Sequence, residues 1–289
     1  MQGLASAVIG SAGMTWIART QSSKHRPMAL SIAQMGISLG VLSPAPAAFV
    51  SYALGPSSPF FILAGLMLLD CAAAVAVMTN DVPGVDTEPD EEPRFWSQLQ
   101  DSHIACLNVL IGMSTCIIGF LQPIIGPYAH EAFGFDIRMQ GVLWFGAAAS
   151  FLATRPIAPL LCARVSGWMV VTGGAGLCAT ALALLAVPSP VFIICGMCGV
   201  GGGNGFVVTP AIPLLADIVE LPDCPYGYGT VFSLVDATSA VGFLVGPFIS
   251  TVPLSFKTKA LGALLTSVIT VCCAVHLRTI EDRKASKNE

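Results

Sequence analysis

The sequence predicts an all-α polytopic membrane protein. Charged residues make up 10% of the 289 residues, and the mean hydropathy is +0.77. Apolar runs recur along the whole chain, and many are long enough to cross a hydrocarbon core, which needs about 20 residues of helix. Helix is the expected state of each run, because an open sheet cannot satisfy its backbone hydrogen bonds in lipid.

We expect about nine transmembrane helices. They lie near residues 3–19, 28–54, 59–78, 104–127, 139–161, 168–187, 190–216, 229–251 and 259–277. These segments do not show the short apolar–polar alternation that is typical of outer-membrane β-strands.

The loop charges predict the orientation of these helices. If residues 20–27 face the cytoplasm, three basic residues lie on the opposite side: Arg138, Lys257 and Lys259. Nine then lie on the cytoplasmic side: Arg19, Lys24, Arg26, Arg94, Arg164, Arg278, Arg283, Lys284 and Lys287. Because basic loops favour the cytoplasm, we expect the N-terminus outside or in a lumen and the C-terminus in the cytoplasm.

One long polar stretch divides the chain. Residues 79–103 hold seven acidic side chains and are expected to form an acidic cytoplasmic linker, with a regulatory or partner-binding segment as the alternative. The predicted domains are a partial N-terminal bundle of three helices at 1–78, the linker at 79–103, a C-terminal six-helix bundle at 104–277 and a cytoplasmic tail at 278–289. A six-helix half is typical of transporters.

Four ionisable residues lie inside the apolar runs: Asp70, Arg155, Asp236 and His276. Such a group costs at least about 2.5 kcal/mol at the bilayer centre, so it is expected to face a partner, a cavity or a path. Asp236 is either a functional carboxylate or a structural one that is hydrogen-bonded between helices. Arg155 either pairs with a carboxylate or reaches the cytoplasmic rim. His276 lies near a helix end, where its side chain can reach the interface.

Glycine and proline interrupt three of the runs. Gln122-Pro123 lies within 104–127, and a proline there frees backbone carbonyls. Residues 199–205 are rich in glycine and include Asn204, and residues 242–247 read Gly-Phe-Leu-Val-Gly-Pro. The glycine run predicts either close helix packing or a flexible segment along a path.

The composition argues against several other classes. The net charge of −4 does not suit nucleic-acid binding. Cys195 and Cys198 have metal-ligand spacing but lie in an apolar run without a second pair, so we expect no cofactor and no metal. The expected partners are a small organic solute, protons and the lipid bilayer.

The order of the motifs resembles the major facilitator superfamily and, within it, the vesicular amine transporters. Residues 228–236, followed by Gly242 to Pro247, are similar to the family's eleventh helix. Residues 59–70 resemble the sixth helix with its acid, and Leu121-Gln122-Pro123 resembles the Leu-Glu-Pro of the seventh. The chain then corresponds to helices 4–12 of 12, as a major-facilitator-type helical bundle.

The resemblance implies a secondary transporter that exchanges protons for organic cations or amines, and not an enzyme. Asp236 and Asp70 are the implied proton-coupling residues, while Gln122, Asn204 and Phe232 are expected along the substrate path. For these last three, ordinary packing is the alternative. The implied location is a vesicle or plasma membrane.

The chain also departs from the family pattern. By this resemblance, Gln122 and Val208 stand where the family has acids, and we expect the chain to lack the first three helices together with their lysine. Asp236 is therefore expected to lack a countercharge and to hold its proton. The alternative function is a truncated isoform or incomplete gene model that acts, if at all, by association with a full-length carrier. An intramembrane aspartyl protease would need Asp70 and Asp236 to share a proton at close range.

Overall fold

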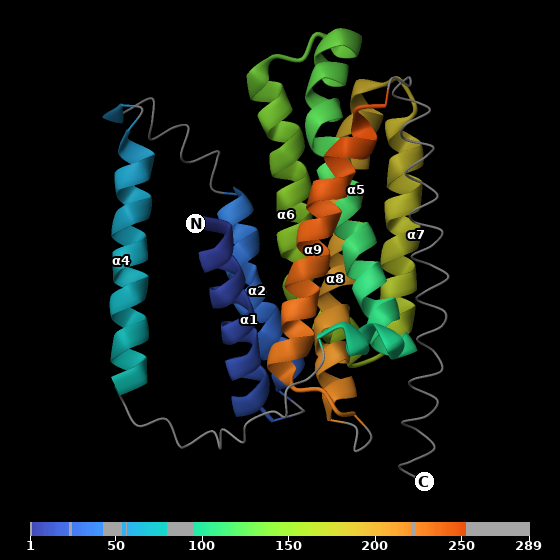
Figure 1. The fold of residues 1–289 in the computed structure, drawn as a ribbon. Coiled ribbons are helices and arrows are strands. Elements are labelled where there is room, and N and C mark those ends of the chain that lie inside the picture. The colour runs from blue at the N-terminus through green and yellow to red at the C-terminus, as the bar shows by residue number, and fades with distance from the viewer. Residues whose placement is uncertain are drawn as a thin grey trace.

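The computed structural model describes residues 2–22, 25–42, 54–55, 57–79, 95–220 and 224–252, and this part of the chain contains helices and no strand (Figure 1). The α-helices are α1 (Gln2–Thr20), α2 (Arg26–Leu42), α4 (Ser58–Thr79), α5 (Ser102–Phe133), α6 (Ile137–Cys162), α7 (Gly167–Leu185), α8 (Pro190–Val219) and α9 (Tyr228–Ser250). A short 3-10 helix, η1 (Phe95–Gln100), precedes α5.

Eight of the predicted spans contain one described α-helix each. By length and composition, the six helices from α4 to α9 can cross a membrane. The predicted span 259–277 and the predicted tail at 278–289 lie outside the described residues, as do His276 and the second part of the span 28–54.

Helices α5, α6 and α7 pack against α8. Helix α8 lies against α6 and α7, and α9 lies along α5. One apolar cluster joins Leu107 and Leu110 of α5 to Leu215 of α8 and Leu234 of α9. A second cluster joins Leu121 of α5 to Leu143 of α6, Leu182 of α7 and Met197 of α8. Apolar side chains thus face other helices as well as lipid, which a uniformly apolar sequence does not specify.

The glycine run in α8 allows close helix packing on two sides. A Cβ atom at Gly203 would lie 2.7 Å from the backbone nitrogen of Cys178 in α7. A Cβ atom at Gly201 would overlap the carbonyl oxygen of Ala147 in α6. The run is continuous helix and its residues 200–205 are buried, so close packing is the interpretation that the structure supports.

Two adjacent glycines of α7 test this packing. A Cβ atom at Gly174 would lie 2.7 Å from Cβ of Phe206, whereas a Cβ atom at Gly173 would meet nothing within 4 Å. We expect Gly174→Val to lower the free energy of unfolding by about 1–3 kcal/mol, because overpacking forces α7 and α8 apart. Gly173→Val is the control. Thermal unfolding in detergent measures both, and equal midpoints would contradict the packing argument.

Helix α5 is longer and less broken than its prolines predict. It continues through Pro123 and Pro127 and ends at Gly134, whose φ of 66° is left-handed. The amide of Phe135 donates to the carbonyl of Ala129 at 3.2 Å, which closes the helix end. The expected interruption at Pro123 is therefore not found in α5.

The end of the predicted linker also has a structural role. Oδ1 of Asp101 accepts hydrogen bonds from the amides of His103 at 2.8 Å and Ile104 at 3.3 Å, which caps α5. Gln98 of η1 is buried, and the hydroxyl of Tyr226 donates to the carbonyl of Ser97 at 2.9 Å. Residues 95–101 therefore pack against the bundle.

Candidate functional site

The N-terminal helices meet the other helices along one interface, which we call the seam: α1 and α2 on one side, and α6, α8 and α9 on the other. Helix α2 packs against α6 and α8, and α1 packs against α9 (Figure 1). An apolar cluster joins the two sides, formed by Ala18, Leu30, Ile212, Ala216 and Phe232. Three groups of polar side chains interrupt this apolar interface.

Asp236 of α9 points across the seam toward α1. A Cβ atom at Gly10 of α1 would lie 3.4 Å from Oδ2 of Asp236, so the glycine leaves room for the carboxyl group. Oδ2 is buried and has no hydrogen-bond partner. Within the described part of the chain, no basic side chain lies within 4.0 Å of Asp236. A charged carboxylate in this place is costly, and binding a proton or an organic cation would remove that cost.

Arg155 of α6 crosses the seam toward α2. Its Nη1 donates to Oε1 of Gln34, and its Nε donates to Oγ of Ser38 at 3.3 Å. Nη1 also donates to Oγ1 of Thr209 in α8 at 3.2 Å. The guanidinium carbon lies 4.4 Å from the ring centroid of Phe151. Only 3% of Arg155 is exposed.

The sequence left two alternatives for Arg155, and the structure shows a third arrangement. The side chain is buried, so it does not reach a solvated rim. Its described partners are two hydroxyls and one amide oxygen, none of which carries a negative charge. The described residues therefore hold the guanidinium by neutral acceptors alone.

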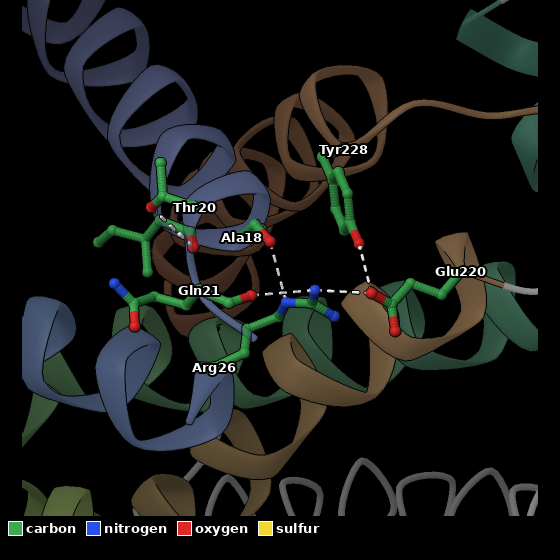
Figure 2. Close-up of polar contacts among 7 residues, drawn as sticks. Ala18, Thr20, Gln21, Arg26, Glu220 and Tyr228 are labelled. Atoms are coloured by element: carbon green, nitrogen blue, oxygen red, sulfur yellow. Dashed lines mark hydrogen bonds and ion pairs between the residues drawn. The ribbon is translucent and has the colours of Figure 1, made fainter. Parts of the chain in front are cut away.

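The third polar group lies at one end of the seam, and we call it the clasp. It consists of the ion pair between Arg26 and Glu220 and the hydroxyl of Tyr228 (Figure 2). Nη2 of Arg26 lies 2.6 Å from Oε1 of Glu220, which also accepts from the hydroxyl of Tyr228 at 3.3 Å. Arg26 donates further to the carbonyls of Ala18 at 3.0 Å and Gln21 at 3.3 Å. The clasp thus joins α1 and α2 to the end of α8 and the start of α9.

Electrostatics keep the clasp charged. The hydrogen bond that Arg26 donates to Glu220 raises the pKa of Arg26 above its ordinary value, although burial acts in the opposite direction. Its guanidinium also lies 5.5 Å from the ring centroid of Tyr228, within the range of a cation–π contact. Arg26 therefore stays protonated throughout the physiological pH range.

Asp236 and the Arg155 group lie at a similar depth below the clasp. Gln34 follows Arg26 by eight residues in α2, and Asp236 follows Tyr228 by eight residues in α9. Eight helical residues span about 12 Å. Both helices begin at the clasp, so the seam has one carboxyl group and one guanidinium at about the same level, each without an opposite charge among its described contacts.

The other predicted site residues are dispersed. Asp70 lies on α4, whose described side chains are almost all exposed and which stands apart from the other helices in Figure 1. Gln122 of α5 is exposed as well. Asn204 of α8 is buried, and its amide oxygen has no hydrogen-bond partner. The structure does not bring Asp70 and Asp236 together, so it does not assemble the pair that an aspartyl protease needs.

Phe232 is 3% exposed, belongs to the apolar cluster of the seam and stacks on Tyr228 with ring centroids 6.3 Å apart. The residues that sequence reasoning missed are the partners across the seam: Gly10, Arg26, Gln34, Ser38, Thr209 and Glu220. Gln34 and Ser38 did carry a signal, since two polar residues four apart share one face of an apolar helix.

Known proteins share both the sequence pattern and the fold. The family model of the Major Facilitator Superfamily matches residues 1–247. The chain is 27% identical over 253 residues to the chromaffin granule amine transporter of Rattus norvegicus, which covers 86% of this chain and 47% of the relative. It is 27% identical over 262 residues to the vesicular acetylcholine transporter of Caenorhabditis elegans, with 86% and 48% covered.

The fold of the human organic anion transporter MFSD10 is similar, with a TM-score of 0.65 and 17% identity, covering 92% of this chain and 66% of that protein. The chain spans about half the length of the curated relatives that it matches. Proteins of this superfamily are membrane transporters and not enzymes. The family match over most of the chain and the all-helical fold agree, and the chain belongs to the major facilitator superfamily.

Proposed function

We propose that this multi-pass membrane protein is a secondary active transporter that exchanges protons for a small organic amine. The observation that carries the proposal is the carboxyl group of Asp236, which lies in the seam without a described countercharge. The relatives at 27% identity are amine and acetylcholine transporters by name, which supports a cationic solute.

Exchange follows from the properties of a single negative site. A proton and an organic cation each neutralise the carboxylate, so binding of one displaces the other. If α1 and α2 move against α6, α8 and α9, Asp236 becomes accessible from one side of the membrane and then from the other. Because the carboxyl group is costly to leave charged in a closed seam, the seam closes most readily when Asp236 is occupied.

The clasp holds one end of the seam closed in this structure. The ion pair between Arg26 and Glu220 joins the two sides of the seam at one end, so separating the sides there breaks the pair. By the loop charges, this end faces the cytoplasm, as do the linker at 79–103 and the C-terminus. The clasp is then the cytoplasmic gate of the proposed carrier, in a vesicle or plasma membrane.

The remaining residues keep their proposed roles. Asp70 is a second proton-coupling candidate, and Gln122, Asn204 and Phe232 are candidates for the substrate path. Asn204 has the strongest structural support, because its buried amide oxygen lacks a partner. The proposed domain division stays at 1–78, 79–103, 104–277 and 278–289.

Reconstituted protein tests the exchange. We expect the full chain in proteoliposomes with an acidic interior to accumulate labelled acetylcholine or phenethylamine, and nigericin to stop the uptake by removing the pH gradient. The energy source must be the proton gradient, because the proposed carboxyl site exchanges a proton for the amine. Uptake that is equal with and without the gradient, or that is no greater than in protein-free vesicles, would contradict the proposal.

A further inference from the structure

We propose that Arg155 is an anion-binding residue of the seam and that it takes the carboxylate of the transported solute. This inference rests on the proposed function, because it names a chemical group of the solute that the carrier moves. It adds a second, oppositely charged contact to the one at Asp236. Three observations support it: the charge balance around Arg155, an unused donor beside it and the helices that supply its partners. The general geometry of guanidinium recognition then selects the ligand.

The charge balance is the first observation. Seven carboxylates lie in the described part of the chain: Asp70, Asp101, Glu131, Asp136, Asp217, Glu220 and Asp236. None of them forms an ion pair with Arg155, which is 3% exposed. A buried charge normally has an opposite charge or a full set of hydrogen bonds. The described contacts of Arg155 use Nε and Nη1, which leaves Nη2 as the edge for a further acceptor.

The second observation is an independent, unused donor. Gln34 is 2% exposed, and its Nε2 is buried without a hydrogen-bond partner. Its Oε1 accepts from Arg155, so the amide nitrogen lies next to the guanidinium. A buried N–H without an acceptor costs free energy until one arrives. The two oxygens of a carboxylate fit this pair of donors, one on Arg155 and one on Gln34.

The third observation is where the partners come from. Gln34 and Ser38 belong to α2, while Arg155 and Thr209 belong to α6 and α8. Opening of the seam separates the first pair from the second, and Arg155 then loses two of its three described acceptors. A solute carboxylate replaces them, because it accepts from the same nitrogens and also supplies the missing charge.

The general geometry of guanidinium recognition selects the ligand. A guanidinium is planar and donates in parallel to two oxygens, so a carboxylate forms two charge-assisted hydrogen bonds with it. A neutral amide of the same shape supplies one acceptor and no charge. Taken with the amine proposed at Asp236, the solute would carry both an amine and a carboxylate. The competing interpretation is a purely structural fastener between α2 and α6, which has no preference among added solutes.

Two matched aromatic probes distinguish these interpretations: benzoate and benzamide. Thermal unfolding of the full chain in nanodiscs is followed at constant ionic strength balanced with sodium chloride. We expect benzoate to raise the midpoint by a few degrees in a saturable way, because a ligand that binds only the folded state stabilises it. Benzamide is expected to leave the midpoint unchanged.

The variants locate the effect. In Arg155→Gln, the benzoate concentration that gives half of the maximal midpoint shift should rise at least tenfold. Arg155→Lys should retain part of the stabilisation by benzoate. Arg138→Gln is the control, since that arginine lies on the same helix but is exposed. If Arg155→Gln does not fold, Gln34→Leu tests the same site, because it removes the unused amide donor.

Equal shifts with benzoate and benzamide, no benzoate shift in the unmodified protein, or full stabilisation of Arg155→Gln would each overturn the anion site and leave the fastener. The binding readout needs no proton gradient. Absence of benzoate stabilisation together with intact pH-driven amine uptake would therefore reject the anion site alone. Benzoate stabilisation without pH-driven amine uptake would reject the proposed function.

Discussion

Asp236→Asn is expected to abolish uptake driven by a pH gradient while leaving the protein folded and inserted. Asparagine has almost the same shape as aspartate but does not bind a proton near neutral pH, so it cannot exchange a proton for a cation. The carboxyl group has a buried oxygen without a donor and no described basic partner, so the substitution breaks no described ion pair. The uptake rate should fall at least tenfold, to the level of protein-free vesicles, with an unfolding midpoint that is unchanged or higher.

Two further variants make this result specific. Glu131→Gln removes an exposed carboxylate at the end of α5, away from the seam, and should retain full uptake. Asp70→Asn tests the second proton-coupling candidate, and full uptake in that variant would restrict proton coupling to Asp236. Proton-driven uptake by Asp236→Asn at the rate of the unmodified protein would contradict the proposed mechanism.

Breaking the clasp is expected to have the next largest effect. Arg26→Gln removes the ion pair with Glu220 and weakens the bonds to the carbonyls of Ala18 and Gln21. Hydrogen bonds to charged groups contribute about 1.5–3 kcal/mol each when they are buried. Because Glu220 is 38% exposed, solvent reduces its share, and we expect a loss of about 1–2 kcal/mol in the free energy of unfolding.

If the clasp is the proposed gate, we expect that the gate no longer closes fully in this variant. In proteoliposomes, Arg26→Gln should dissipate a preset pH gradient faster than the unmodified protein, which a pH-sensitive dye reports. Glu220→Gln should increase the leak similarly. The double variant should lose less free energy of unfolding than the sum of the two single losses, since both changes remove the same ion pair. Strictly additive losses, or an unchanged leak in both single variants, would show that the pair does not close the seam.

Much of the fold could be predicted from the sequence. Apolar runs of membrane-spanning length predicted the eight described α-helices, because the bilayer fixes both the length and the helical state of such segments. The ends were less certain. Helix α5 continues through two prolines to a left-handed glycine at 134, since its neighbours support a helix that local propensity would break.

The candidate site could be predicted only in part. Asp236 and Arg155 were found because a charge in an apolar run is rare and costly. Their partners were not found, because Gly10, Gln34 and Thr209 are ordinary residues whose roles depend on helices far away in the sequence. Asp70 also lies inside an apolar run, but its side chain is exposed on α4, so its role in proton coupling stays a prediction.

The amino-acid sequence was sufficient to predict a helical membrane protein, the positions of most of its helices and the charged residues inside them. These properties follow from the cost of transferring each residue into lipid, which depends on composition along the chain. The three-dimensional packing was needed to show which helices meet at the seam, that Arg155 donates to neutral acceptors of α2 and α8, and that Arg26 pairs with Glu220. Those properties depend on packing between distant segments, where small residues decide how closely two helices approach.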